Sequence, residues 1–360
     1  QDAAQVALEK FKSRQIDRRS FMTALAGLGL AATFKPGAAS AEVSEIVICN
    51  WGGAALEAFE KAYGAPFTDA TGIEVVVDGA GPSTGAVRAM VESKNVIWDA
   101  TDGGMVDATT LGAGGYIEPI DYSIVDKSLV GEGLAAEYGI CNYTFSNVLA
   151  YDATKTGETA PTSWADFFDL EKYPGKRTMC KWIQGQLESV LLADGVKPED
   201  MYPLDVDRAF AKLEPLLPEI IFWEGGAQSQ QLFRDGEVVM GNIWHTRANL
   251  LRKENPDFTW TWNQNLLFAS AWSVPKGNPA GKKVFDFINS SLQPEGQVEL
   301  LRLMGNGPSN PKALELMTEE DKAVYALAPE NAKNNLPVSA AYYAENEAEL
   351  QNRFLDFISR

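Results

Sequence analysis

Short β-branched runs alternate with longer helical stretches through most of this chain, and that alternation restricts the folds open to it. Residues 45–50 (EIVICN) are typical of a strand, and residues 54–68 follow with apolar side chains at helical spacing. A second strand is expected at 73–78, followed by a helix that Ser83 or Thr84 caps. Alternation of this kind favours parallel strands joined by crossover helices, so we expect an α/β protein.

The same pattern continues to the end of the chain. Further strands are expected at 98–101, 143–152, 177–182, 220–223, 238–244 and 266–274, and further helices at 163–170, 186–193 and 206–216. A chain of 360 residues is longer than one hydrophobic core usually supports, so we expect two lobes. Ligands of open α/β sheets bind beyond the carboxyl ends of the strands. The loops at 51–54, 81–84 and 102–105 are therefore expected to face one crevice.

Composition disfavours several classes of function. The chain has 31 Lys+Arg against 49 Asp+Glu, a net charge of -18, and no basic run, so it repels phosphate backbones and we expect no nucleic-acid partner. Its single histidine, His245, excludes metal sites that need two imidazoles, and Cys49, Cys141 and Cys180 lack the spacing of zinc or redox motifs. We expect no metal and no cofactor, and we interpret the cysteines as small buried apolar residues.

The first 41 residues resemble a twin-arginine export signal. Arg18-Arg19 precedes an uncharged stretch at 23–34, and Ala39-Ser40-Ala41 offers the small residues of a cleavage site. The apolar stretch is about a dozen residues, short of the roughly twenty that a membrane-spanning helix needs. We therefore expect a cleavable signal at 1–41 and a periplasmic protein, with an ordinary amphipathic helix as the alternative.

Several segments of the body together resemble a known family. They are VICNW at 47–51, WD at 98–99, TSWADF at 162–167 followed by YPGK at 173–176, FRDGEV at 233–238 followed by IW at 243–244, and WSVP at 272–275. In this order and spacing they resemble the extracellular solute-binding proteins of ABC importers, in the branch of the periplasmic spermidine/putrescine receptors. The resemblance covers residues 44–360.

This resemblance implies a two-lobed periplasmic-binding-protein fold, in which each lobe is a mixed, mostly parallel sheet flanked by helices and hinge strands cross between the lobes. It divides the chain into 42–145 plus 271–315 and 146–270 plus 316–360. It also implies a monomer that is not an enzyme, and that closes by a hinge motion on a small molecule. The partner it implies is an ABC permease in the inner membrane.

When the ligand-binding positions of the polyamine receptors are matched to this sequence, several of the residues differ. Trp51 and Trp244 match cleft tryptophans, but Gly52-Gly53 stands where the receptors have polar and acidic residues. Their second-lobe acids fall in the segment that contains Lys181 and Trp182, and their acid beside the hinge falls near Ser270. A diammonium ligand would meet positive charge where it needs carboxylates, so a polyamine is only the alternative ligand.

We expect instead a small anionic ligand, an organic acid with or without an aromatic or amino group. Lys181, Arg247 and His245 would supply positive charge, and Trp51, Trp182, Trp244 and Phe268 would supply flat apolar walls. Asn306 either contacts the ligand or is a turn residue. The expected ligand-binding residues are Trp51, Gly52, Gly53, Asp102, Gly103, Lys181, Trp182, Trp244, His245, Arg247, Phe268, Ser270 and Asn306.

Three other features of the sequence are weighed as signs of another function or of a structural role. Residues 81–85 (GPSTG) match GxSxG, and Ser83 with His245 would suit a secreted serine hydrolase, although the motif follows only two strands instead of several. Tyr342-Tyr343 is similar to the tyrosine pair of ferric-ion receptors, but core packing explains it better. The acidic stretches at 318–321 and 345–349 are interpreted as solvated faces or a helix cap.

Overall fold

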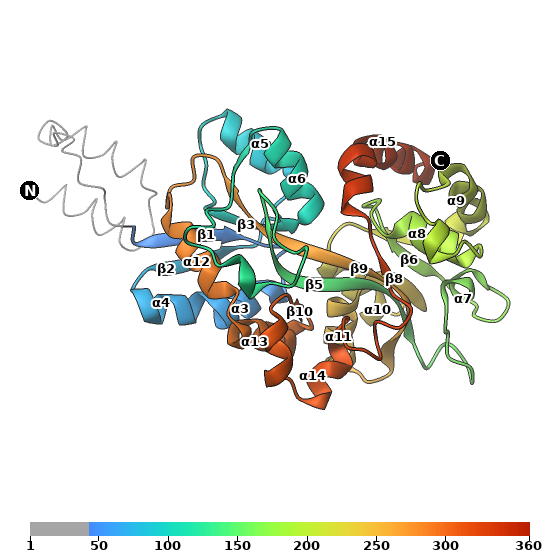
Figure 1. Ribbon diagram of the computed structural model, residues 1–360. Helices are drawn as coiled ribbons and strands as arrows, with labels where there is room; N and C mark the ends of the chain where they lie inside the picture. Colours follow the sequence, from blue (N-terminus) through green and yellow to red (C-terminus); the bar gives the residue numbers. More distant parts are fainter. Residues whose placement is uncertain (1–42) are drawn as a thin grey trace, which may run out of the picture. The chain divides into compact units, whose positions relative to one another are not determined.

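A computed structural model describes residues 43–360, and the predicted export signal at 1–41 lies outside the described residues. Figure 1 shows strands surrounded by helices. The strands are β1 (Glu45–Cys49), β2 (Glu74–Asp78), β3 (Ala100–Gly104), β4 (Ile117–Glu118), β5 (Ile140–Asp152), β6 (Arg177–Cys180), β7 (Ile220–Trp223), β8 (Met240–Trp244), β9 (Phe258–Pro275), β10 (Gly307–Pro308) and β11 (Leu336–Pro337).

The helices cover both faces and the ends of the sheet. The α-helices are α3 (Ala54–Phe59), α4 (Ala65–Thr71), α5 (Thr84–Glu92), α6 (Met105–Ala113), α7 (Trp164–Phe168), α8 (Gln186–Ala193), α9 (Val206–Leu213), α10 (Gly226–Arg234), α11 (His245–Glu254), α12 (Lys283–Ser291), α13 (Pro294–Met304), α14 (Glu319–Val324) and α15 (Ala340–Ile358). A π-helical turn at Glu60–Gly64 joins α3 and α4 into one continuous helical segment that runs from Ala54 to Thr71. None of the helices in the described part of the chain has both the length and the hydrophobicity needed to cross a membrane.

The sheet confirms the predicted α/β class and is mixed. Its main path runs β2-β1-β3-β9-β5-β8-β6-β7. At either end the pairs are parallel, as predicted, but β9 pairs antiparallel with both β3 and β5, and β5 pairs antiparallel with β8. Figure 1 shows β5 and β9 running between the part of the sheet with β1–β3 and the part with β6–β8.

Most predicted strands and helices are confirmed, and the exceptions have local causes. The third strand begins at Ala100 and not at Trp98, whose indole is buried and donates to Asp78 Oδ2 at 2.7 Å. The strand predicted at 177–182 ends at Cys180, which leaves Trp182 in a loop. The strand predicted at 266–274 begins eight residues earlier, at Phe258.

Separate hydrophobic clusters lie along the sheet. One surrounds Phe59, Trp272 and Phe287, whose rings meet edge to face. Another joins α8 to α15 through Leu187 and Phe354. The prediction for the cysteines is confirmed, because Cys49, Cys141 and Cys180 are all free and buried.

Two predicted caps are also present. Ser83 caps α5, since its Oγ accepts a hydrogen bond from the Ala86 N–H at 3.2 Å. Thr318 caps α14 in the same way, with a reciprocal bond between the Thr318 N–H and the Asp321 carboxylate at 2.9 Å. Ser83 thus has a structural role at the start of a helix.

Candidate ligand-binding site

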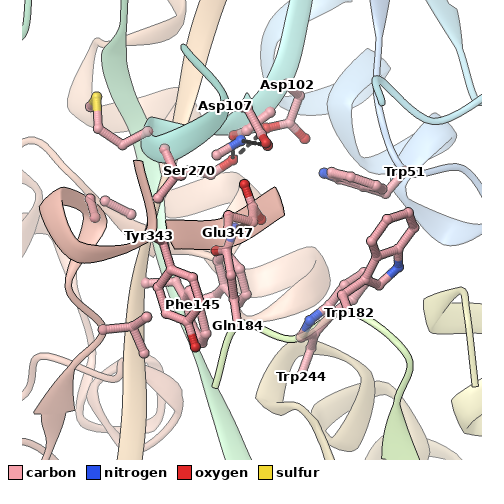
Figure 2. A pocket seen from close by; sticks show the side chains of 18 of the residues that line it. Trp51, Asp102, Asp107, Phe145, Trp182, Gln184, Trp244, Ser270, Tyr343 and Glu347 are labelled. Atoms are coloured by element: carbon pink, nitrogen blue, oxygen red, sulfur yellow. Dashed lines mark hydrogen bonds between the residues drawn. The ribbon is translucent and has the colours of Figure 1, made fainter. Parts of the chain in front are cut away.

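A cavity of about 630 Å³ opens where several strand ends meet. The loops predicted to face one crevice do line it, through Trp51, Ser83, Thr84 and the 102–105 segment. Its other walls come from β5, the β6–α8 loop, the start of α11, β9 and α15. Figure 2 shows these side chains converging from separate elements.

Most of the predicted ligand-binding residues lie on the wall of this cavity. They come from sequence positions between 51 and 306, so only the fold brings them together. The residues that line it are Trp51, Asp102, Gly103, Trp182, Trp244, Arg247, Phe268, Ser270 and Asn306.

Gly52 and Gly53 lie just behind this wall. Both have positive φ angles, 67° and 63°, which favour glycine. A Cβ on Gly52 would lie 2.8 Å from the Gly79 carbonyl oxygen, and one on Gly53 would lie 3.6 Å from Arg247 Nη1. The glycine pair thus lets the β1–α3 turn approach the next loop and the Arg247 side chain.

Arg247 is a buried positive charge on the cavity wall that no carboxylate pairs with in residues 43–360. It lies in the first turn of α11 and is only 2% exposed, and its Nε and Nη1 have no hydrogen-bond partner in residues 43–360. Its Cζ lies 6.0 Å from the centroid of the Trp244 ring. Burial lowers the pKa of Arg247, but an arginine keeps its charge at neutral pH. An uncompensated buried guanidinium calls for an anion that accepts its hydrogen bonds.

Aromatic rings surround the cavity. Trp51 and Trp244 meet edge to face with centroids 6.1 Å apart, and Phe145 stacks on Phe268 at 5.0 Å. Trp182 is 48% exposed, and its Nε1 donates to the Glu224 carbonyl oxygen at 3.1 Å. Flat apolar walls of this kind suit the carbon chain of a small ligand.

Asp102 is buried and fully engaged by protein donors. Its carboxylate accepts hydrogen bonds from Asn142 Nδ2 at 2.9 Å, Tyr143 Oη at 3.0 Å and Ser270 Oγ at 2.8 Å. Burial raises the pKa of Asp102 to about 6, although these hydrogen bonds favour the charged form. Asp102 therefore ties β3 to β5 and β9 at the back of the cavity.

The expectation that Lys181 turns into the cleft is not met. Its Nζ pairs with the carboxylate of Glu224 instead, and the lysine side chain is 40% exposed. Because β6 ends at Cys180, Lys181 lies in the following loop, where water and a neighbouring acid compete for its charge. Arg247 is thus the cation of the predicted set that reaches the cavity.

His245 likewise lies outside the cavity wall, in the protein interior. Its Nε2 donates to the Gly305 carbonyl oxygen at 2.7 Å, and its Nδ1 accepts from the Ser146 N–H at 2.9 Å. Burial lowers the pKa of His245 to about 4, so the ring is neutral at pH 7. It joins α11 to β5 and to the end of α13.

This contact pattern also bears on the hydrolase alternative. Both His245 nitrogens are bound to backbone groups, and Ser83 Oγ accepts from a helix N–H. Within residues 43–360 no hydrogen bond joins Ser83 to His245. A serine nucleophile needs such a base within reach, so the geometry does not support this reading.

Replacing His245 with glutamine should change how stability depends on pH. An unfolded histidine gains a proton near pH 6.5, whereas the buried ring resists protonation down to about pH 4, so the wild type loses stability as the pH falls through this window. Between pH 7.5 and pH 5 the wild type should lose about 2 kcal/mol more unfolding free energy than His245→Gln. Urea denaturation at both pH values measures this difference. Equal losses of unfolding free energy in the wild type and the variant would contradict the conclusion that His245 is buried in its neutral form.

Sequence reasoning missed the contribution of α15. Tyr343, Glu347 and Gln351 recur every four residues and so form one stripe of this helix, and all three line the cavity. Gln351 holds the β6–α8 loop on both sides of Trp182, because its Oε1 accepts from Ile183 N and its Nε2 donates to the Lys181 carbonyl oxygen, both at 2.8 Å. The acidic stretch at 345–349 is therefore not simply a solvated face, whereas Tyr343 packs in the core as predicted.

This chain is similar to proteins that are named as small-molecule receptors or were solved with a bound ligand. A curated relative from Pseudomonas aeruginosa, a gamma-aminobutyric acid-binding protein, is 34% identical over 93% of this chain and 96% of its own. A solved GABA receptor is 33% identical with a TM-score of 0.79, covering 87% of this chain and 97% of the receptor. AgtB from Agrobacterium tumefaciens, solved with agropinic acid, is 31% identical with a TM-score of 0.82, covering 88% and 99%.

A family model matches most of the described chain as well. The model is that of the bacterial extracellular solute-binding protein, and it matches residues 62–332. The resemblance inferred from the sequence motifs is thereby confirmed at the level of the family. The chain belongs to the bacterial extracellular solute-binding proteins, and the relatives that it matches include substrate-binding proteins of ABC transporters.

Proposed function

We propose that this protein is a monomeric periplasmic receptor that captures a small amino-bearing carboxylate and delivers it to an ABC permease. The observation that carries this proposal is Arg247, a buried guanidinium with unpaired donors on the cavity wall. In a chain of net charge -18 such a group is conspicuous, and it suits a ligand carboxylate. Gamma-aminobutyric acid, the ligand named for two of the relatives, belongs to this class, and agropinic acid, named for a third, is also an acid.

The mode of capture is also part of the proposal. We keep the division into lobes at 42–145 plus 271–315 and 146–270 plus 316–360, with export by the signal at 1–41. The two largest hydrophobic clusters support this division, since apart from Val106 and the partly buried Leu250 each draws on one predicted lobe. The ligand contacts groups of both lobes and so stabilises the closed state. No catalytic step is assigned to any residue.

A series of four-carbon ligands tests the charge requirement. Gamma-aminobutyrate has a carboxylate and an ammonium, butyrate has only the carboxylate, and putrescine has only ammonium groups. Calorimetric titration should give the highest affinity for gamma-aminobutyrate, butyrate weaker by about tenfold or more, and no heat of binding for putrescine. Tightest binding of putrescine would instead support the polyamine alternative and would contradict the role of Arg247.

A further inference from the structure

Three carboxylates outside the predicted set also line the cavity; Glu345 is exposed, whereas Asp107 and Glu347 are partly buried. Asp107 lies in the first turn of α6 and Glu347 lies on α15. These two helices contact one another. Figure 2 shows the two carboxylates in the same part of the cavity, with Trp51, Trp182 and Trp244 across from them. The pair thus joins the helix after β3 to a helix late in the chain.

Each of these carboxylates keeps an oxygen without a protein partner. Asp107 Oδ2 accepts from the Gly104 N–H at 3.0 Å, and Glu347 Oε1 accepts from Gln184 Nε2. Within residues 43–360 neither Asp107 Oδ1 nor Glu347 Oε2 accepts a hydrogen bond, and no lysine or arginine pairs with either residue. Burial, followed by the negative charge of Glu347, raises the pKa of Asp107 to about 6. Two such carboxylates facing one another favour a cation between them.

Asp102 differs from Asp107 and Glu347 in its burial and in its hydrogen bonds. It is only 1% exposed and already accepts hydrogen bonds from three protein donors. Its charge is therefore satisfied without a ligand, and an ammonium reaching it would have to displace or crowd donors that hold three strands together. Unlike Asp102, both Asp107 and Glu347 keep a carboxylate oxygen that accepts no hydrogen bond within residues 43–360.

Other groups on the cavity wall also call for a ligand with both charges. Arg247 is almost completely buried beside Trp244, and within residues 43–360 its Nε and Nη1 and the buried side-chain oxygens of Asn147 and Asn306 have no hydrogen-bond partner. Anion-seeking and cation-seeking groups thus line the same cavity. In Figure 2 Trp244, the neighbour of Arg247, lies across the cavity from Glu347.

From this arrangement we infer that Asp107 and Glu347 together form the subsite for the ligand's ammonium group. This inference rests on the proposed function, in which Arg247 takes the carboxylate. Because the two charges bind on different walls, the subsite selects an ammonium remote from the carboxylate over one on the neighbouring carbon. The ammonium also links α6 to α15, so its binding favours closure.

Conservative amide variants test the subsite. Asp107→Asn and Glu347→Gln keep the oxygens that Gly104 and Gln184 use but remove the charge. Each should weaken gamma-aminobutyrate about tenfold or more in calorimetric titration, while butyrate affinity stays equal or rises because repulsion is relieved. The double variant should also lose the wild type's preference for gamma-aminobutyrate over alpha-aminobutyrate. Glu349→Gln, an exposed acid on the same helix, is the matched control and should change neither ligand.

The outcomes separate the subsite from the proposed function. Equal losses of gamma-aminobutyrate and butyrate in the amide variants, or loss of the ammonium preference in Asp102→Asn alone, would overturn the subsite and leave the carboxylate receptor standing. A wild-type protein that binds none of the carboxylates would overturn both. Thermal unfolding of each ligand-free variant shows whether it is folded before binding is compared.

Discussion

Replacing Arg247 with methionine should abolish carboxylate binding, with a loss of at least about 100-fold in affinity. Two donors of the guanidinium, Nε and Nη1, are buried and have no hydrogen-bond partner in residues 43–360. Each hydrogen bond to a charged group contributes about 1.5–3 kcal/mol, so losing two of them accounts for such a change. Calorimetric titration with gamma-aminobutyrate and butyrate measures it, and both ligands should lose affinity to a similar extent.

In the absence of ligand, the same substitution should not reduce the stability of the protein. Removing a buried charge that lacks a partner relieves a desolvation cost, so Arg247→Met should be as stable as the wild type or more stable. Arg252→Met is the matched control, because Arg252 lies on the same helix but stacks on Trp260 at 3.9 Å, away from the cavity. Carboxylate affinity within about threefold of the wild type in Arg247→Met would refute the assignment of this residue.

A methyl group added at Gly226 should weaken carboxylate binding although no charged residue is replaced. A Cβ built on Gly226 would lie 2.3 Å from Arg247 Nε and 2.9 Å from its Cζ, distances that atoms do not adopt. Trp244 Cζ3 would be only 3.0 Å away on another side. The guanidinium must therefore move in Gly226→Ala, and we expect at least about a tenfold loss of carboxylate affinity.

The neighbouring glycine supplies the control for this experiment. A Cβ on Gly225 would have no atom of residues 43–360 within 4 Å, and Gly225 has an extended backbone with φ of -140°. Gly225→Ala should thus bind carboxylates like the wild type. If the two alanine variants bound gamma-aminobutyrate equally well, the position of Arg247 would not depend on the space beside Gly226, and its orientation in the site would need another explanation.

Local patterns in the sequence predicted much of the fold. β1 and β2 follow from β-branched runs, and the start of α5 follows from a serine that caps it. The extent of β9 was underestimated because its first half, FTWTWNQ, contains polar residues that a partly exposed strand tolerates. The alternation of strands and helices favoured parallel pairing, and the resemblance implied a mixed, mostly parallel sheet. The antiparallel pairing of β5 with β9 is a long-range choice that local periodicity does not encode.

The site was predictable where it depends on residue type and strand ends, and less so where it depends on distant partners. Arg247 could be identified as a cation beside a cleft tryptophan. Lys181 could not be excluded, because the acid that pairs with it, Glu224, lies 43 residues later in the sequence. Glu347 was missed for the same reason, since its partner Gln184 is 163 residues away and a run of acids on a helix is usually solvated.

The three cysteines have a consequence for redox chemistry. Burial raises the pKa of Cys49 and of Cys141 to about 12, and burial raises the pKa of Cys180 as well. Disulfide exchange requires a thiolate, and burial keeps the Cys49 and Cys141 thiols protonated at pH 7. In an oxidising compartment such as the proposed periplasm, the folded receptor is therefore inert to thiol exchange. Its exposure to oxidation is confined to the unfolded chain.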